Sequence, residues 1–206
     1  MSDTLEMKMR LNLSLTLNHC PFEIYGVETR QFLRKRSGES MRHVVMKWLS
    51  YILFYHDDLQ IEASASQHFK PDLVRFGEDG RVPVQWIDCG QTALQKLDKI
   101  SQKNRETMID IVKATPQELE AYKLQANTRL KAPERVRYWS FEDGLVQRLG
   151  SLLHGRHDVI ATVSKGFEYV YLVIDGQEEL RARVVWLNQA VSPVKERVSL
   201  NDKARS

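Results

Sequence analysis

An alternation of side chains near the amino terminus constrains the fold more than any other feature of the sequence. From residue 7 to residue 18, every odd position holds Met or Leu and every even position holds a charged or polar residue. Successive side chains of a β-strand point to opposite faces, so this pattern predicts a long strand with one buried face. The fold must therefore contain a sheet whose other strands bury the same face.

The remaining patterns predict an α/β (α+β) fold with a mixed sheet. Apolar spacings of three and four, together with capping signals, predict helices at residues 39–56, 92–103, 116–130 and 143–154. Apolar and β-branched runs between turn signals predict strands at residues 22–34, 59–62, 72–76, 82–88, 107–112, 136–140, 159–164, 168–174 and 180–187. The chain ends of this fold, residues 7–34 and 157–188, are expected to form an additional antiparallel sheet.

Length and composition indicate the class of protein. The 206 residues are expected to form a single domain over residues 1–190, with a core at 38–140 and a polar tail at 191–206. The formal net charge of +3 permits a nucleic-acid partner without requiring one. Two cysteines cannot build a disulfide framework, no apolar stretch reaches the roughly 20 residues that span a bilayer, and the first residues do not resemble a signal peptide. We expect a cytoplasmic protein without a membrane segment, and the sequence leaves its oligomeric state open.

Two aspartates mark a candidate site at the end of a predicted β-hairpin. If Val74 pairs with Trp86, then Phe76 pairs with Val84 and Asp72 lies opposite Asp88. Directly opposed side chains share a face about 5 Å apart. Two carboxylates at that separation repel each other unless a cation lies between them, and Mg²⁺ is a typical one.

Lysines follow the second aspartate. Lys96, Lys99 and Lys103 fall on one side of the next predicted helix, and one of them can stabilise negative charge beside the two acids. A divalent cation, two carboxylates and an ammonium group together suit metal-assisted phosphodiester hydrolysis. The alternative is an ordinary arrangement in which the acids end two strands and the lysines form a solvated helix face.

Several short motifs, taken in order, resemble a known family. They are Gly38-Glu39-Ser40 before a helix with Leu49-Ser50-Tyr51, Pro71-Asp72-Leu73, Trp86-Ile87-Asp88-Cys89-Gly90, and Lys99 in the next helix. Pro71-Asp72 followed by an acid on a strand is similar to the PD-(D/E)xK nuclease signature. The chain looks like the YaeQ family over most of its length, from about Leu11 to Leu187.

This resemblance implies a nuclease-like core at 38–140 and a set of site residues. Asp72 and Asp88 would be ligands of Mg²⁺ or Mn²⁺, and Glu39 would be an accessory acid. Lys99, displaced from its usual position, would stabilise charge, with Lys96 as the alternative, and Gln91 would orient water. The usual signature has a lysine two residues after the second acid, where this chain has Gly90.

Two functions are therefore weighed. The first is a divalent-metal-dependent nuclease acting on DNA or RNA. The second is a catalytically inactive nuclease fold that binds nucleic acid or protein, and metal titration separates the two. A small-molecule enzyme would instead need a deep apolar pocket away from Asp72. The basic run at residues 34–36 either contacts a phosphate backbone or is a solvated loop.

Overall fold

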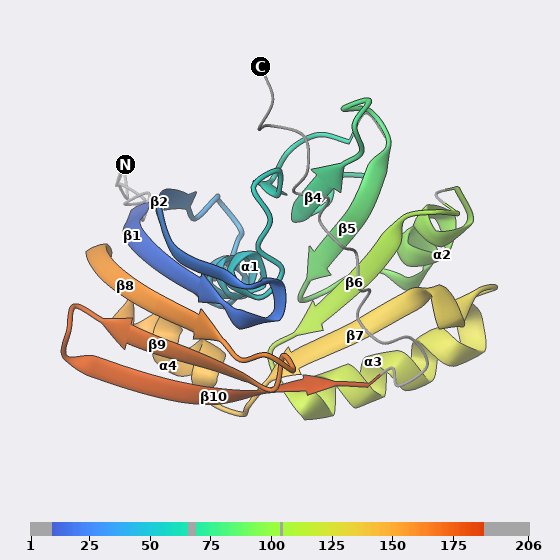
Figure 1. The fold of residues 1–206 in the computed structure, drawn as a ribbon. Helices are drawn as coiled ribbons and strands as arrows, with labels where there is room; N and C mark the ends of the chain where they lie inside the picture. The colour runs from blue at the N-terminus through green and yellow to red at the C-terminus, as the bar shows by residue number, and fades with distance from the viewer. Residues whose placement is uncertain (1–9, 66–68, 104, 188–206) are drawn as a thin grey trace, which may run out of the picture.

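A computed structural model describes residues 10–65, 69–103 and 105–187. Within them, strands and helices follow one another in the order expected of a mixed α/β fold (Figure 1). The helices are α1 (Met41–Leu53), α2 (Leu94–Lys103), α3 (Pro116–Arg129) and α4 (Leu145–Leu152). The strands are β1 (Arg10–His19), β2 (Ile24–Arg34), β3 (Gln60–Ile61), β4 (Leu73–Phe76), β5 (Pro83–Cys89), β6 (Met108–Lys113), β7 (Val136–Phe141), β8 (Gly155–Val163), β9 (Tyr169–Ile174) and β10 (Glu178–Trp186). Short 3₁₀ turns lie at Cys20–Phe22 and Pro133–Arg135.

The described strands form one sheet in the order β2-β1-β8-β9-β10-β7-β6-β5-β4-β3. This corrects the expectation of a separate antiparallel sheet. β10 pairs with β9 over its first six residues and with β7 over Val184–Trp186, so it joins the chain ends to the central strands. The first strand does lie beside the C-terminal strands, but β1 and β8 pair in parallel. The polar tail at 191–206 and the start of the first predicted strand, residues 7–9, lie outside the described residues.

The alternation near the amino terminus has the predicted effect. Leu11, Leu13, Leu15 and Leu17 of β1 are all buried, whereas the polar residues between them are exposed or half-buried. The buried face of β1 and of β8–β10 packs against α1 and α4. No described helix covers the opposite face of these strands, as Figure 1 shows.

Helix α1 occupies the centre of the molecule. Its residues 44–53 are all buried, because it packs against the terminal strands on one side and against β4–β6 on the other. Burial on every side of a helix is typical of a central position in a core. The Ser40 side chain caps its first turn by accepting a hydrogen bond from the backbone N–H of His43. The opposite face of β5–β7 is covered by α2 and α3 in a second apolar cluster.

The hairpin of β4 and β5 has the predicted register at one rung. Val74 lies opposite Trp86, as expected, but Phe76 lies opposite Pro83 and not Val84, because an irregularity follows Arg75. β5, β6 and β7 then run parallel to one another, and their carboxyl ends meet at one edge of the sheet. Ligands of α/β sheets commonly bind at such an edge.

Candidate functional site

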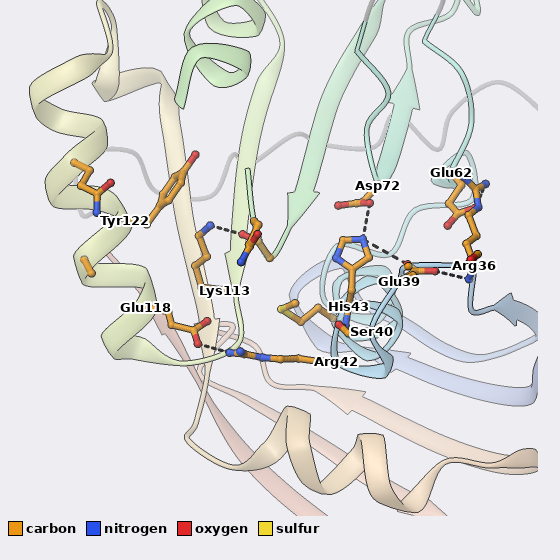
Figure 2. Close-up of a pocket in the computed structure, with 17 residues that line it drawn as sticks. Arg36, Glu39, Ser40, Arg42, His43, Glu62, Asp72, Lys113, Glu118 and Tyr122 are labelled. Atoms are coloured by element: carbon orange, nitrogen blue, oxygen red, sulfur yellow. Dashed lines mark hydrogen bonds and ion pairs between the residues drawn. The ribbon is translucent and has the colours of Figure 1, made fainter. Parts of the chain in front are cut away.

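A pocket of about 960 Å³ opens at the carboxyl ends of β5 and β6. We call it the Asp72 pocket. It is lined by the start of α1, by the residues after β5, by the end of β6 and by one side of α3 (Figure 2). The lining residues are Arg36, Ser37, Gly38, Glu39, Ser40, Arg42, His43, Met46, Glu62, Asp72, Gly90, Gln91, Lys113, Glu118, Ala121, Tyr122 and Gln125. Of the residues predicted for the site, Asp72, Glu39 and Gln91 reach this pocket.

Asp72 is held from both sides. Its Oδ1 lies 3.0 Å from His43 Nε2, and its Oδ2 accepts a 2.7 Å hydrogen bond from the backbone N–H of Cys89. Burial raises the pKa of Asp72, but the hydrogen bond and charge of His43 and the Cys89 N–H outweigh burial, so the pKa is lowered overall. The same hydrogen bond raises the pKa of His43. Both shifts favour a carboxylate at Asp72 and a protonated imidazole at His43.

Glu39 lies next to the same imidazole. His43 Nε2 is 3.6 Å from Glu39 Oε1, so this one nitrogen stands between two carboxylates (Figure 2). Lys47, which is 2% exposed, places its Nζ 2.6 Å from Glu39 Oε1 and also pairs with Glu62. Burial lowers the pKa of Lys47, but the hydrogen bonds and charges of Glu39 and Glu62 reverse this effect and raise it. The acids of the pocket are thus neutralised by the chain's own cations.

Asp88 lies behind the pocket and does not line it. Trp86, two residues earlier on β5, belongs to the apolar cluster under α2 and α3, and Asp88 follows it on that face. Its Oδ2 lies 2.8 Å from Lys96 Nζ of α2. Burial raises the pKa of Asp88, Lys96 opposes that effect, and the charge of Asp72 raises it further. Asp72 and Asp88 are therefore close enough to interact, but they face different surroundings.

The two candidate lysines of α2 differ in position. Lys96 is the one beside an acid; it also donates to the backbone carbonyl of Lys70. Lys99 is exposed, with its Nζ 6.0 Å from the centre of the Phe69 ring, and it does not line the pocket. Within the described residues, no group of three His, Cys, Asp or Glu side chains is arranged as a set of metal ligands. The assignment of Asp72, Asp88 and Glu39 as ligands stays a prediction.

Lys113 is a site residue that the sequence reasoning missed. It ends β6, and the parallel register that places Val112 beside Cys89 brings Lys113 beside Gly90. Its Nζ donates to the Gly90 carbonyl oxygen and lies 3.6 Å from the centre of the Tyr122 ring (Figure 2). Burial lowers the pKa of Lys113 to about 8. A lysine at the end of an apolar strand, on the edge where parallel strands finish, was the available signal.

Gly90 leaves little room for a larger side chain. Its φ is +70°, and a Cβ at this position would lie 3.1 Å from Met46 Cε and 3.3 Å from His43 Nδ1. A lysine at residue 90 would strain the backbone and press on the residues beneath it. Lys113 instead brings its ammonium to the same carbonyl from β6.

Comparison with known proteins now identifies the family. The model of the YaeQ protein family matches residues 9–182. The chain belongs to the YaeQ family. Two solved YaeQ proteins share the fold: that of Xanthomonas axonopodis pv. citri has a TM-score of 0.72 at 18% identity, over 87% of this chain and 98% of its own. The YaeQ protein of Pseudomonas syringae has a TM-score of 0.73 at 17% identity, over 88% of this chain and 97% of its own. No curated protein matches the chain.

Membership of the YaeQ family confirms the family resemblance predicted from the motifs, together with a mixed α/β fold. In this YaeQ-family chain, none of the described helices is long and apolar enough to cross a membrane.

Proposed function

We propose that the Asp72 pocket binds a divalent cation and hydrolyses phosphodiester bonds of nucleic acid. One observation carries this proposal. Asp72 and Glu39 present carboxylate oxygens to a single nitrogen atom, His43 Nε2, at 3.0 and 3.6 Å. Two acids that converge on one point, in an open pocket with cationic side chains on its walls, are the elements that metal-assisted phosphoryl chemistry needs.

The donor set fits Mg²⁺ or Mn²⁺. Both are oxygen-binding cations that one or two carboxylates hold together with water and substrate phosphate. Asp72 and Glu39 would be the first ligands, in the place that His43 Nε2 occupies. Asp88 would be a further ligand once it leaves Lys96. Its Oδ2 lies 2.8 Å from Lys96 Nζ, and apart from the Trp86 side chain no other described side chain acts on it as a donor, so a cation could replace Lys96.

Side chains in and beside the Asp72 pocket would each contribute to hydrolysis when a cation is bound. A bound divalent cation supplies a polarised phosphoryl oxygen and an activated water. Arg42, which pairs with Glu118 at the rim, and Arg36, which pairs with Glu62, would bind the flanking phosphates. Lys113 Nζ, whose pKa is about 8, would hold a proton near neutral pH and donate it to the developing negative oxygen. Gln91 would orient water, and Lys96, in place of Lys99, would neutralise Asp88 as long as no metal is bound.

The alternative is a nuclease fold that binds nucleic acid without cleaving it. It is favoured by the same cations: His43 and Lys47 already neutralise Asp72, Glu39 and Glu62 without a metal. In this case the pocket would bind phosphate through Arg36, Arg42 and Lys113, and metal would have no effect.

Metal titration tests the site directly. We expect calorimetry with Mn²⁺ to show binding to the wild type, and Asp72→Asn or Glu39→Gln to weaken it by about tenfold or more, because each removes a charged ligand. His43→Ala should strengthen binding, because it removes a competing cation. Asp58→Asn is the matched control, since the Asp58 side chain is 74% exposed and does not line the pocket. No binding, or equal affinity in Asp72→Asn and Asp58→Asn, would overturn the metal site.

Cleavage tests the reaction. Labelled single- and double-stranded DNA and RNA are incubated with Mg²⁺, with Mn²⁺ or with EDTA. We expect metal-dependent cleavage, and a loss of about 100-fold in Lys113→Met with metal binding retained. Lys103→Met, on the exposed side of α2, is the control and should cleave normally. Oligonucleotide binding without cleavage under any of these conditions would support the binding module.

A further inference from the structure

A group of arginines surrounds an exposed phenylalanine on the uncovered face of the sheet. We call Arg10, Arg30, Phe32, Arg34 and Arg156 the arginine patch; all five are exposed. The register brings them together from three strands. Arg10 lies opposite Arg34, and Asn12 lies between Phe32 and Arg156. Arg30 follows in the next row, opposite Ser14.

The patch carries an unfavourable electrostatic energy in the free protein. Like charges directly opposite each other on paired strands are destabilising, and Arg10 and Arg34 are such a pair. Within the described part of the chain, none of the four arginines forms an ion pair. The first carboxylates on this face are Asp158, which lies opposite Ser14 in the row of Arg30, and Glu28, which follows Arg30 on the same face of β2. A polyanion bound across the patch would remove the repulsion.

Phe32 gives the patch a second property. Its side chain is 74% exposed, and it lies on β2, the edge strand of the sheet at the left of Figure 1. A free aromatic ring among guanidinium groups is the combination on which unpaired bases stack while their phosphates are neutralised. Arginine suits both tasks, because its planar group binds phosphate through two hydrogen bonds and also stacks on bases.

The patch and the Asp72 pocket are close along the chain. β2 ends at Arg34, and Arg36, two residues later, lines the pocket. Two residues span at most about 7 Å, so a strand that leaves the patch at Arg34 has to pass around the end of β2 to reach the pocket at the start of α1.

We propose that the arginine patch binds single-stranded nucleic acid and leads it along the end of β2 towards the Asp72 pocket. The destination of the strand rests on the proposed function, whereas binding to the patch does not. Phosphates contact the four arginines and one base stacks on Phe32. A double helix is disfavoured, because its bases are not free to stack on a side chain.

Fluorescence anisotropy of a labelled 20-nucleotide oligo-dT, in EDTA and at several salt concentrations, tests the proposal. The triple variant R30Q/R34Q/R156Q should bind about tenfold more weakly or worse, and its dependence of log affinity on log salt should be shallower by about two. The control R81Q/R105Q/R129Q removes the same charge from other exposed arginines and should bind like the wild type. Phe32→Ala should weaken binding by about tenfold, and Phe32→Trp should retain it.

Each alternative outcome is distinct. Equal binding by the two triple variants, with both folded by circular dichroism, overturns the patch. Binding of the patch to phosphatidylserine vesicles but not to oligo-dT overturns it in favour of a membrane surface. A change of oligomeric state in R30Q/R34Q/R156Q overturns it in favour of contact between copies of the chain. If oligo-dT binding depends on the patch but no nucleic acid is cleaved, the arginine patch is supported and the proposed reaction is overturned. If cleavage occurs and the patch variants cleave like the wild type, the proposed reaction is supported and the arginine patch is overturned.

Discussion

Asp88 and Asp110 lie on neighbouring parallel strands, and both are almost completely buried, but their surroundings differ. Asp110 of β6 accepts four hydrogen bonds, from Gln85 Nε2 at 2.8 Å, Trp139 Nε1 at 2.8 Å, Arg137 Nε at 2.7 Å and Arg137 Nη2 at 2.6 Å. Asp88 of β5 has the Lys96 ammonium 2.8 Å from its Oδ2, and the Trp86 side chain adds a weaker hydrogen-bonding contribution, so fewer donors reach it than reach Asp110.

The difference separates a structural carboxylate from a candidate functional one. A buried charge is tolerated when donors saturate it, as they do at Asp110, whose hydrogen bonds join three neighbouring strands, β5, β6 and β7. Asp88 lacks that saturation, has a raised pKa because of its burial, and lies directly behind a polar pocket. Buried acids with incomplete partners and shifted pKa values cluster at functional sites.

The largest expected effect is on stability. Asp110→Asn leaves the half-buried Arg137 guanidinium without the counter-charge of a fully buried carboxylate, and loss of one partner of a buried pair costs about 3–5 kcal/mol. Asp88→Asn should cost less than about 1 kcal/mol, because Lys96 is 24% exposed and can turn to solvent. Urea denaturation at pH 7 measures both. Equal losses would show that Asp88 is a structural anchor like Asp110.

The pH dependence of stability gives a second test, with opposite signs for two acids. The pKa of Asp88 is raised above 3.8, so above pH 3.8 the unfolded chain ionises this group while the folded chain still holds its proton. Asp88 therefore lowers stability as pH rises through that window, by about 1.4 kcal/mol per pH unit. The pKa of Asp72 is lowered, so its contribution is present above pH 3.8 and is lost as pH falls below it.

Urea midpoints of the wild type, Asp88→Asn and Asp72→Asn between pH 3 and 7 separate these contributions. As pH rises, the stability of Asp88→Asn should increase relative to that of the wild type, and the stability of Asp72→Asn should decrease relative to it. The same trend in both variants would mean that the two carboxylates share one environment, contrary to the structure.

Much of the fold could be predicted from the sequence, because its signals are local. The Met/Leu alternation of β1 and the three-four spacing of α1 each report which side chains are buried. The order of the strands in the sheet, by contrast, depends on pairings between segments that are far apart in the sequence. The parallel pairing of β1 with β8 joins residues about 145 apart, and the continuity of the sheet depends on β10 changing partner near Val184. No pattern within one segment reports such pairings.

Short sequence motifs predicted the acidic residues of the candidate site but not its cationic ones. Asp72 and Glu39 reach the pocket, as the motif order suggested, but its cations could not be predicted. His43 and Lys47 lie one and two turns into α1, where their types fit an ordinary helix, and Lys113 comes from a different strand. Their role depends on distances between segments that only the folded chain defines.

The smallest expected effect concerns the glycine between Asp88 and the pocket. Gly90 and Gly176 both have positive φ, +70° and +67°, so an alanine at either position incurs about 1 kcal/mol of backbone strain. Only Gly90 has neighbours in the way, Met46 Cε at 3.1 Å and His43 Nδ1 at 3.3 Å from the added Cβ, whereas nothing lies within 4 Å at Gly176.

Gly90→Ala should therefore cost about 1 kcal/mol more than Gly176→Ala in urea denaturation. It should also shift the His43 imidazole signals in NMR spectra, because the added Cβ displaces the ring that contacts Asp72. Equal losses of unfolding free energy in the two alanine variants, with unchanged His43 signals, would show that the end of β5 has room for a side chain. The absence of a lysine two residues after Asp88 would then have another cause.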